Sequence, residues 1–192
     1  MVRYRHLPCD LYGDTVYVNA KKYTSLCGNI CALIFATDFG WSQVYGMATK
    51  SDAHDTLSLL FQRNGVPNQL IVDSAKELRK EESGQKCREA FCYLKGTEPY
   101  SPWQNAAERE NKELKKDAGR KMTASSAPLK VWDWALEMEY FIRSHTAHNI
   151  YKLDGRGRVP ESIISGQTAD FSPYCEYGFW QWVMFRKPGD SA

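Results

Sequence analysis

The segment Ile30–Thr37 has the sequence Ile-Cys-Ala-Leu-Ile-Phe-Ala-Thr, an almost unbroken apolar run of strand length. A short run without polar alternation is typical of a strand that is buried on both faces. Such a strand lies inside a sheet whose two faces are both covered. The segment therefore predicts a layered α/β domain.

Patterns on either side of this run predict the rest of the sheet and its helices. β-rich segments predict further strands, at residues 14–19, Trp41–Met47, Gln69–Val72 and Leu94–Thr97. Periodicity, caps and breakers predict helices, over Lys50–Asn64, within Glu81–Tyr93, from Asn105 to Gly119 and over Ser125–Asn149. Up to Gly119 the order is β-β-β-α-β-α-β-α, a mixed α/β domain. We expect residues 151–170 to be irregular and Phe179–Arg186 to form one more strand.

Composition narrows the class of protein. A length of 192 residues with 43% hydrophobic content fits one globular domain with a substantial core, which excludes a disordered chain. The net charge of +2 and the pI near 8.2 indicate that any basic surface for nucleic acid is local. No apolar run is long enough for a signal peptide or a membrane span, so we expect a soluble intracellular protein with no membrane partner.

Six cysteines are scattered along the chain without Cys-x-x-Cys spacing, and several fall in apolar segments. Buried, reduced thiols account best for this distribution. The alternative is a zinc site that joins Cys27 and Cys31 to His145 and His148, although the spacings are loose and the histidines fall in a helical segment.

The segment Thr97–Lys121 predicts a rigid loop that leads into a helix. Its two prolines hold the first part extended, and strong helix formers follow Asn105 until Gly119. Asn105 is the natural N-cap, with Glu108 three positions later as its capping-box partner.

Four side chains share one face of this helix, at i, i+3, i+4 and i+7: Glu108, Asn111, Lys112 and Lys115. The carboxylate is suited to a divalent cation, and the lysines are suited to the phosphates of a nucleic acid. The alternative is a solvated helix that is stabilised by Glu/Lys pairs.

Three acidic residues stand where a metal site would need them. Asp14 begins the first predicted strand, Asp73 ends the strand after the first helix, and Glu108 lies in the first turn of the later helix. If the two strands are neighbours, the three carboxylates come together and repel one another unless cations lie between them. Two Mg²⁺ or Mn²⁺ ions about 4 Å apart fill such sites in phosphodiester transfer. Taken singly, the acids are also explained as a turn residue, a cap and a capping-box member.

These residues resemble the catalytic core of retroviral and retrotransposon integrases. Asp14, Asp73 and Glu108 are similar to its two Asp and one Glu, with 34 residues between the last two. The run Asn111–Lys116, Asn-Lys-Glu-Leu-Lys-Lys, resembles the segment after the catalytic Glu of retroviral integrases, and Pro99–Pro102 resembles the preceding loop of copia-type elements.

The resemblance implies an RNase H-like α/β fold with a five-stranded mixed sheet flanked by helices. It covers roughly residues 10–190 and implies a catalytic core at 10–165, between a lead-in at 1–9 and a C-terminal extension at 166–192. Asp38 corresponds to a non-catalytic acid of the second strand and ranks below Asp14 as a metal ligand. The chain is also implied to be a piece of a longer polyprotein.

The same resemblance implies the chemistry and the partners. Asp14, Asp73 and Glu108 are the implied catalytic residues and would bind two Mg²⁺ or Mn²⁺ ions. The implied DNA contacts are Lys112, Lys115, Asn111, Gln104 and Tyr100. The chain would process the 3′ ends of double-stranded retroelement DNA and join them to target DNA in the nucleus. It would do so as a homo-oligomer, with the apolar helix Ser125–Asn149 as a contact.

Two other functions fit the same residues. One is a decayed or domesticated DNA-binding and assembly module that keeps the fold without catalysis, which an assay for metal-dependent strand transfer would distinguish. The other is a different RNase H-like nuclease, which explains the three acids but not the run Asn111–Lys116. Hydrolysis of RNA–DNA hybrids would support that nuclease.

Overall fold

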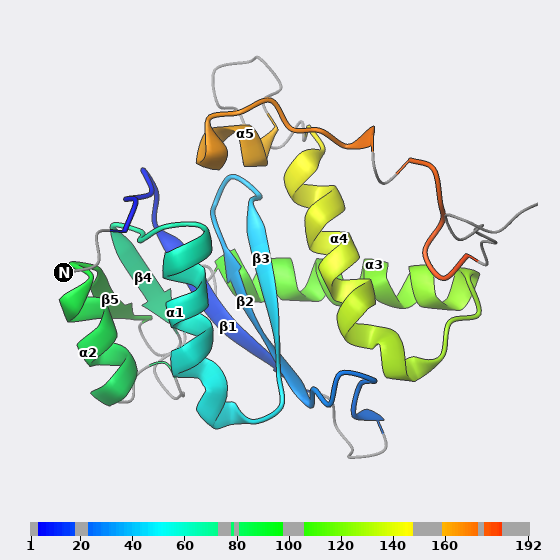
Figure 1. Cartoon of the computed structure of the whole chain (residues 1–192), viewed down its shortest axis with the longest axis horizontal. Helices are drawn as coiled ribbons and strands as arrows, with labels where there is room; N and C mark the ends of the chain where they lie inside the picture. The colour runs from blue at the N-terminus through cyan, green and yellow to red at the C-terminus, as the bar shows by residue number, and fades with distance from the viewer. Residues whose placement is uncertain are drawn as a thin grey trace, which may run out of the picture.

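Five strands form one mixed sheet in the order β3-β2-β1-β4-β5 in the computed structural model, which describes residues 4–17, 23–72, 78, 81–97, 106–147, 159–172 and 175–181 (Figure 1). The strands are β1 Leu11–Tyr17, β2 Cys31–Ala36, β3 Ser42–Met47, β4 Gln69–Val72 and β5 Tyr93–Gly96. The pairs β1–β2 and β2–β3 are antiparallel, whereas β1–β4 and β4–β5 are parallel. The predicted five-stranded mixed sheet is confirmed.

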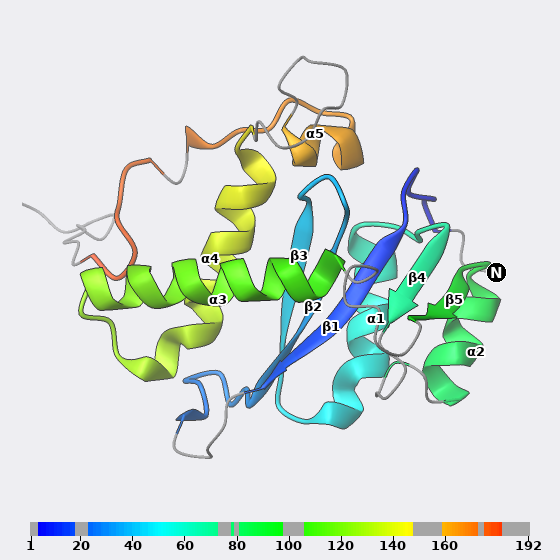
Figure 2. The same ribbon diagram turned by 180° about the vertical axis from the view of Figure 1, so that it is seen from behind.

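Helices cover both faces of this sheet. They are α1 Ala53–Arg63, α2 Glu81–Glu89, α3 Ala106–Ala124, α4 Trp132–His145 and α5 Pro160–Ser165, with 3₁₀ turns η2 Lys50–Asp52 and η5 Leu129–Val131. Helices α1 and α2 share one buried apolar cluster with the sheet, and α3 and α4 share a second cluster on the other face. Figure 2 shows α3 crossing over β1 and β2. Within the described part of the chain, no helix is long and apolar enough to cross a membrane.

Strand β2 lies between the two clusters, as its apolar run predicts. All six of its residues are buried. Leu33 and Phe35 belong to the cluster under α1, and Ala32 and Ile34 belong to the cluster under α3 and α4. Successive side chains of a strand point to opposite faces, so an apolar residue is needed at every position.

Strand β1 begins three residues earlier than predicted. Asp14 therefore lies in the middle of the strand, and the prediction that it begins the strand was wrong. The reason is that Leu11 is completely buried and pairs with Leu70 of β4, while the same strand pairs with β2 on its other side. Ladder hydrogen bonds to two neighbours extend the strand beyond the short β-rich pattern.

Helix α3 continues through Gly119 to Ala124, and the prediction that it ends at Gly119 was wrong. Ala118 and Met122 are buried in the cluster that α3 shares with α4. Burial of this face offsets the cost of a glycine inside a helix, which is about 1 kcal/mol.

The helix predicted over Ser125–Asn149 is shorter than expected. Ser126 has a φ of 53°, which breaks the chain direction after α3. Pro128 is extended and leads into η5, so that α4 begins only at Trp132 and ends at His145.

One prediction about the C-terminal part was also wrong, and another falls mostly outside the described residues. The segment expected to be irregular contains α5, which begins with Pro160 and ends at Gly166 with a φ of 74°. Proline at the first helical position and glycine just beyond the last residue are regular helix boundaries. Phe179 and Trp180 lie in a turn and not in a strand, and the rest of Phe179–Arg186 falls outside the described residues from 182 on.

The segment before β1 is fastened to the core and to α5. Leu7 is 1% exposed and belongs to the cluster under α1. The Arg5 guanidinium donates a hydrogen bond to the carbonyl of Ile164, whose side chain lies in the same cluster. In the same helix Glu161 accepts a hydrogen bond of 2.8 Å from the indole of Trp41. Helix α5 and the N-terminal segment are thus both parts of the main body of the fold.

Candidate active site

The carboxylate of Asp14 is fixed by two hydrogen bonds on the sheet face that α3 covers. Its Oδ1 accepts a bond of 2.8 Å from the backbone N–H of Thr15. Its Oδ2 accepts a bond from the side-chain amide of Asn111 in α3. Each carboxylate oxygen keeps a further lone pair, so the group remains able to bind a cation.

Asn111 joins α3 to the central strand. Its side chain is almost completely buried, and its Oδ1 has no hydrogen-bond partner among the described residues. Glu108 lies three positions earlier on the same helix face, about 4.5 Å along the axis. The contact between Asn111 and Asp14 therefore brings the first turn of α3, with Glu108, to the middle of β1.

The oxygen atoms on these facing parts of β1 and α3 are of the kind that binds a hard divalent cation. Carboxylate oxygens of Asp14 and Glu108 and the unpartnered amide oxygen of Asn111 are the ligand types that Mg²⁺ and Mn²⁺ prefer. No three His, Cys, Asp or Glu side chains converge on one point among the residues that the structure describes. Asp73 falls outside them, and β4 ends at the preceding Val72.

The lysines of the predicted stripe are exposed. The Lys112 ammonium lies 3.1 Å from the Glu108 carboxylate, and both groups face solvent. An exposed helical pair of this kind contributes only about 0.3–0.5 kcal/mol, so it is easily exchanged for contacts to an anion. Lys115 is also exposed, one turn further along. Tyr100 and Gln104, the other predicted DNA contacts, fall outside the described residues.

The opposite side of α3 carries three ion pairs that hold it against α4. Arg143 Nε lies 2.7 Å from Glu110 Oε1, and its Nη2 donates to Oε2 at 3.2 Å, while Asp117 lies 3.5 Å from Nη1. Lys121 Nζ lies 2.9 Å from Glu139 Oε1. Both glutamates are buried, and these pairs fix the helix that carries the stripe. Sequence reasoning missed them, because Glu110 and Arg143 are 33 residues apart and no local spacing connects them.

The zinc alternative is not supported by the described residues. Cys27, Cys31 and His145 do not form a metal-binding group, and His148 is outside the described part. None of the six cysteines forms a disulfide, and Cys31, Cys87 and Cys92 are buried as expected, whereas Cys27 and Cys175 are exposed. Burial and the nearby Asp10 and Asp38 carboxylates raise the pKa of Cys9 to about 12, which keeps that thiol protonated.

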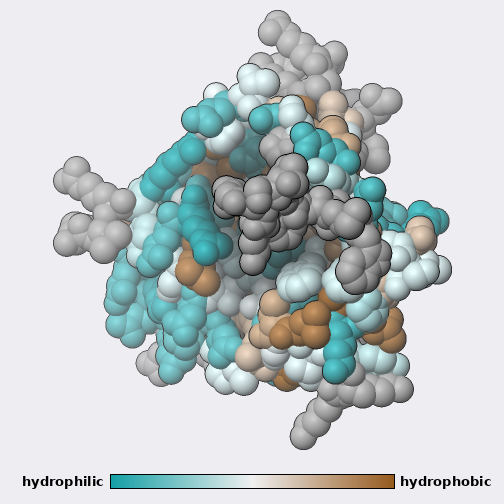
Figure 3. All heavy atoms as spheres, turned by 45° about the vertical axis from the view of Figure 1, so that its right-hand side comes forward, coloured by the Kyte–Doolittle hydropathy of each residue, from teal (hydrophilic) through white to brown (hydrophobic). Residues whose placement is uncertain are grey.

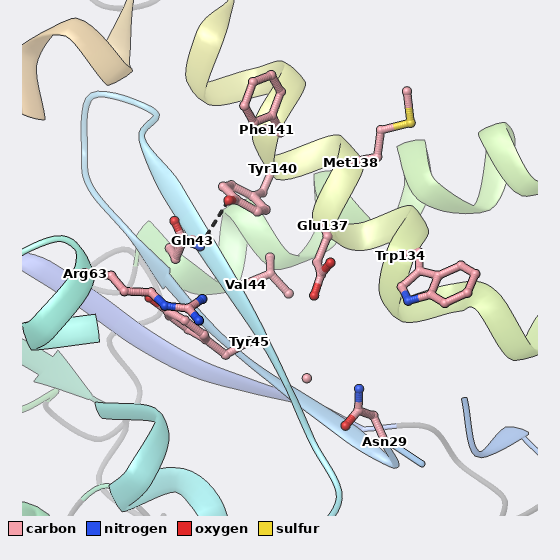
Figure 4. A pocket seen from close by; sticks show the side chains of 11 residues that line it. Asn29, Gln43, Val44, Tyr45, Arg63, Trp134, Glu137, Met138, Tyr140 and Phe141 are labelled. Carbon is pink, nitrogen blue, oxygen red and sulfur yellow. Dashed lines mark hydrogen bonds between the residues drawn. The ribbon is translucent and has the colours of Figure 1, made fainter. Parts of the chain in front are cut away.

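A polar cavity of about 520 Å³ lies away from Asp14, between β3 and α4 (Figure 4). Gln43 of β3 donates a hydrogen bond of 3.1 Å to the Tyr140 hydroxyl across it, and Glu137 points toward β3. Burial, with Asp133 nearby, raises the pKa of Glu137, and Arg63 opposes that shift. Trp134 and Met138 of α4 also line this cavity.

Exposed apolar side chains occur near the start of α4. Leu26 and Leu129 are 58% and 61% exposed, and the N–H of Leu26 donates to the carbonyl of Lys130 at 2.8 Å. Figure 3 shows that hydrophobic side chains gather in one part of this side of the molecule, whereas most of the side is hydrophilic. Contiguous apolar surface of this kind is typical of a contact with another molecule.

Two solved structures share this architecture. One is the cryoEM structure of the simian T-cell lymphotropic virus intasome in complex with PP2A regulatory subunit B56 gamma, with a TM-score of 0.63 and 16% identity over 100% of this chain and 64% of that chain. The other is the HTLV-2 integrase catalytic core domain in complex with magnesium, in a trimeric form, with a TM-score of 0.59 and 16% identity over 84% of this chain and 99% of that chain.

These likenesses establish the fold. The chain has the RNase H-like fold of retroviral integrase catalytic cores, which confirms the predicted resemblance at the level of architecture. It spans 64% of the length of the matched intasome chain. No protein-family model and no curated protein matches the sequence.

Proposed function

We propose that this chain is the catalytic core of a copia-type retroelement integrase, which processes the 3′ ends of element DNA and joins them to target DNA. The observation that carries the proposal is the hydrogen bond from Asn111 to Asp14, because it sets the stripe of α3 beside an acid of the central strand. The shared fold supports the same conclusion, and one structural neighbour is a catalytic core solved with magnesium.

In this proposal Asp14, Asp73 and Glu108 hold two Mg²⁺ or Mn²⁺ ions. When bound, such ions activate the attacking oxygen and neutralise the leaving oxygen of a phosphodiester. The parallel register pairs Gly13 with Val72. Asp14 and Asp73 directly follow these two residues in the sequence, one Cα–Cα step of about 3.8 Å further along the chain. This register supports Asp73 as the third ligand.

The remaining residues of the groove position the substrate. Asn111 orients the Asp14 carboxylate, and Lys112 and Lys115 neutralise phosphates of the DNA end. Tyr100 and Gln104 belong to the same groove in this proposal. The residues 10–165 would be the core, between a lead-in at 1–9 and an extension at 166–192, and the site of action would be the nucleus.

A short duplex with a blunt, unprocessed element end tests the proposed reaction. Wild-type protein should cut the strand next to the 3′ end and join it to a second duplex when Mg²⁺ or Mn²⁺ is added, and Asp73→Asn should do neither. Protein that binds the duplex but never cuts it would favour the silent module of the same fold. Cleavage restricted to RNA–DNA hybrids would favour another RNase H-like nuclease.

The salt dependence of DNA binding tests the lysine stripe. Replacing Lys112 and Lys115 with alanine removes two counterion-releasing contacts, so the slope of log K against log salt should become shallower by about two units. Fluorescence anisotropy from about 50 to 300 mM salt measures the slope.

Lys130→Ala, which removes an exposed charge in η5, is the matched control and should leave the slope within about half a unit. Equal slopes in all three proteins would mean that the stripe is only a solvated face. Lys121 does not serve as a control, because it pairs with buried Glu139.

We also propose that the protein self-associates through the face of α4 that carries Trp134 and Met138. Trp134 is 39% exposed beside the cavity of Figure 4, and the structural neighbours are an intasome and a trimeric core. Met138→Lys should shift the sedimentation coefficient from oligomer to monomer at micromolar concentration. Leu59→Lys, at an apolar position of α1 that is as exposed as Trp134, should leave it unchanged. A wild-type protein that sediments as a monomer at the same concentration would contradict the proposal.

A further inference from the structure

An apolar cavity of about 420 Å³ lies between β1, α3 and the start of α4. Val16 lines it, two residues after Asp14 on the same face of β1. Lys115 lines it as well, four residues after Asn111 on the same face of α3. Strand and helix both advance by about 6 Å over these steps. The cavity therefore lies about 6 Å beyond the contact between Asp14 and Asn111, along both β1 and α3.

The walls of this cavity combine aromatic rings with positive charge. Tyr23 and Trp132 contribute the rings, and the indole of Trp132 donates a hydrogen bond of 2.9 Å to the carbonyl of Tyr23. Lys115 is the charged residue of the lining. The described residues that line the cavity include no acid.

Gly119 lines the open side of the cavity. It lies eleven residues after Glu108 and four after Lys115, so it continues the face of α3 that carries the stripe. A Cβ built at Gly119 would meet no atom within 4 Å. A glycine in the middle of a helix is unfavourable by about 1 kcal/mol relative to alanine. Here it leaves this part of the cavity wall without a side chain.

We propose that this cavity receives one unpaired base of the DNA strand whose phosphate Lys115 holds, about two nucleotides from the Asp14 carboxylate. A base stacks on aromatic side chains regardless of its identity, and its phosphate meets the lysine at the mouth. The distance follows from the step of about 6 Å along the groove and the rise of about 3.4 Å per stacked nucleotide. This inference rests on the proposed function, because it takes the DNA path from the stripe.

Photo-crosslinking tests the position of the base without any variant protein. A series of duplexes with a frayed 3′ end carries 5-iododeoxyuridine at one position each, and the complexes are irradiated in Ca²⁺ and digested for mass spectrometry. One position, about two nucleotides from the cleavage point, should crosslink to Tyr23 or Trp132. A bound duplex that gives crosslinks elsewhere, and none to these two rings from any position, would overturn the proposal.

Filling the cavity gives a second, independent test. Gly119→Leu should raise or preserve the melting temperature, because leucine favours helix and the space is open, yet it should weaken binding of the frayed duplex by about tenfold. A fully paired, cross-linked duplex of the same sequence should lose much less affinity. Gly84→Leu in α2 is the matched control, since the nearest atom to its Cβ is the flexible end of Arg88 at 3.5 Å.

The outcomes separate this inference from the proposed function. Crosslinks to Tyr23 or Trp132 in a protein that never cleaves DNA would support the base site and contradict the enzyme. Normal cleavage by Gly119→Leu, with wild-type affinity for the frayed duplex, would support the enzyme and overturn the base site. If Gly119→Leu instead altered only the sedimentation of the protein, the cavity would be a protein contact, and the inference would be wrong.

Discussion

Asp14→Asn should reduce metal-dependent DNA cleavage by about a thousandfold or more, which corresponds to about 4 kcal/mol of lost transition-state stabilisation. The substitution removes an anionic ligand at nearly constant volume. The new amide oxygen still accepts the hydrogen bond from Asn111, so the contact between β1 and α3 should persist. Cleavage of a labelled duplex under single-turnover conditions measures the loss, and circular dichroism verifies the fold.

The control for this experiment is Asp38→Asn. Asp38 is an exposed acid that follows β2, and it carries the same charge change outside the proposed metal site. Its cleavage rate should stay within about threefold of wild type. If Asp14→Asn also retained activity within about tenfold, Asp14 would not be a metal ligand.

Arg143→Met should lower the free energy of unfolding by about 3–5 kcal/mol, the largest stability effect we expect from a single substitution of a charged residue here. The arginine makes two short contacts to Glu110, and the Glu110 side chain is only 7% exposed. Without its partner that carboxylate is left buried and charged. Urea denaturation followed by circular dichroism measures the change.

Two further variants separate this mechanism from a general loss of packing. Arg120→Met removes an arginine that contacts Asp117 at 3.3 Å but is 69% exposed, so it should cost no more than about 1 kcal/mol. The double variant Glu110→Leu/Arg143→Met removes both charges and should recover much of the stability. A double variant as unstable as Arg143→Met alone would show that the buried charge is not the cause.

The architecture was predictable where one local pattern decided the outcome. The apolar run of β2 predicted its burial on both faces, and the helical face of Glu108, Asn111, Lys112 and Lys115 is present on α3. Both features depend on the period of side chains along a strand or helix, which the sequence contains directly.

The sequence did not predict features that depend on contacts between distant segments. Gly119 suggested the end of a helix, because the burial of Ala118 and Met122 against α4 is invisible locally. Asp14 was expected at the start of β1 because the local pattern does not show that Leu11 pairs with β4. Its partner there, Leu70, is 59 positions away in the sequence. In the candidate site, the hydrogen bond between Asn111 and Asp14 joins residues 97 positions apart. Tertiary contacts of this kind override local propensity.

The fastening of the N-terminal segment to α5 has a consequence for synthesis on the ribosome. The bond from Arg5 to the Ile164 carbonyl spans 159 positions, and that from Trp41 to Glu161 spans 120. Neither bond can form until α5 has left the exit tunnel, although β1, β2 and β3 can pair much earlier. Contacts with such long sequence separation form slowly, because the loop they close is large. The nascent chain should therefore pass through a stage in which β1, β2 and β3 are paired but α5 has not yet packed against Leu7 and Trp41. At that stage the apolar surface that α5 later covers is accessible to chaperones.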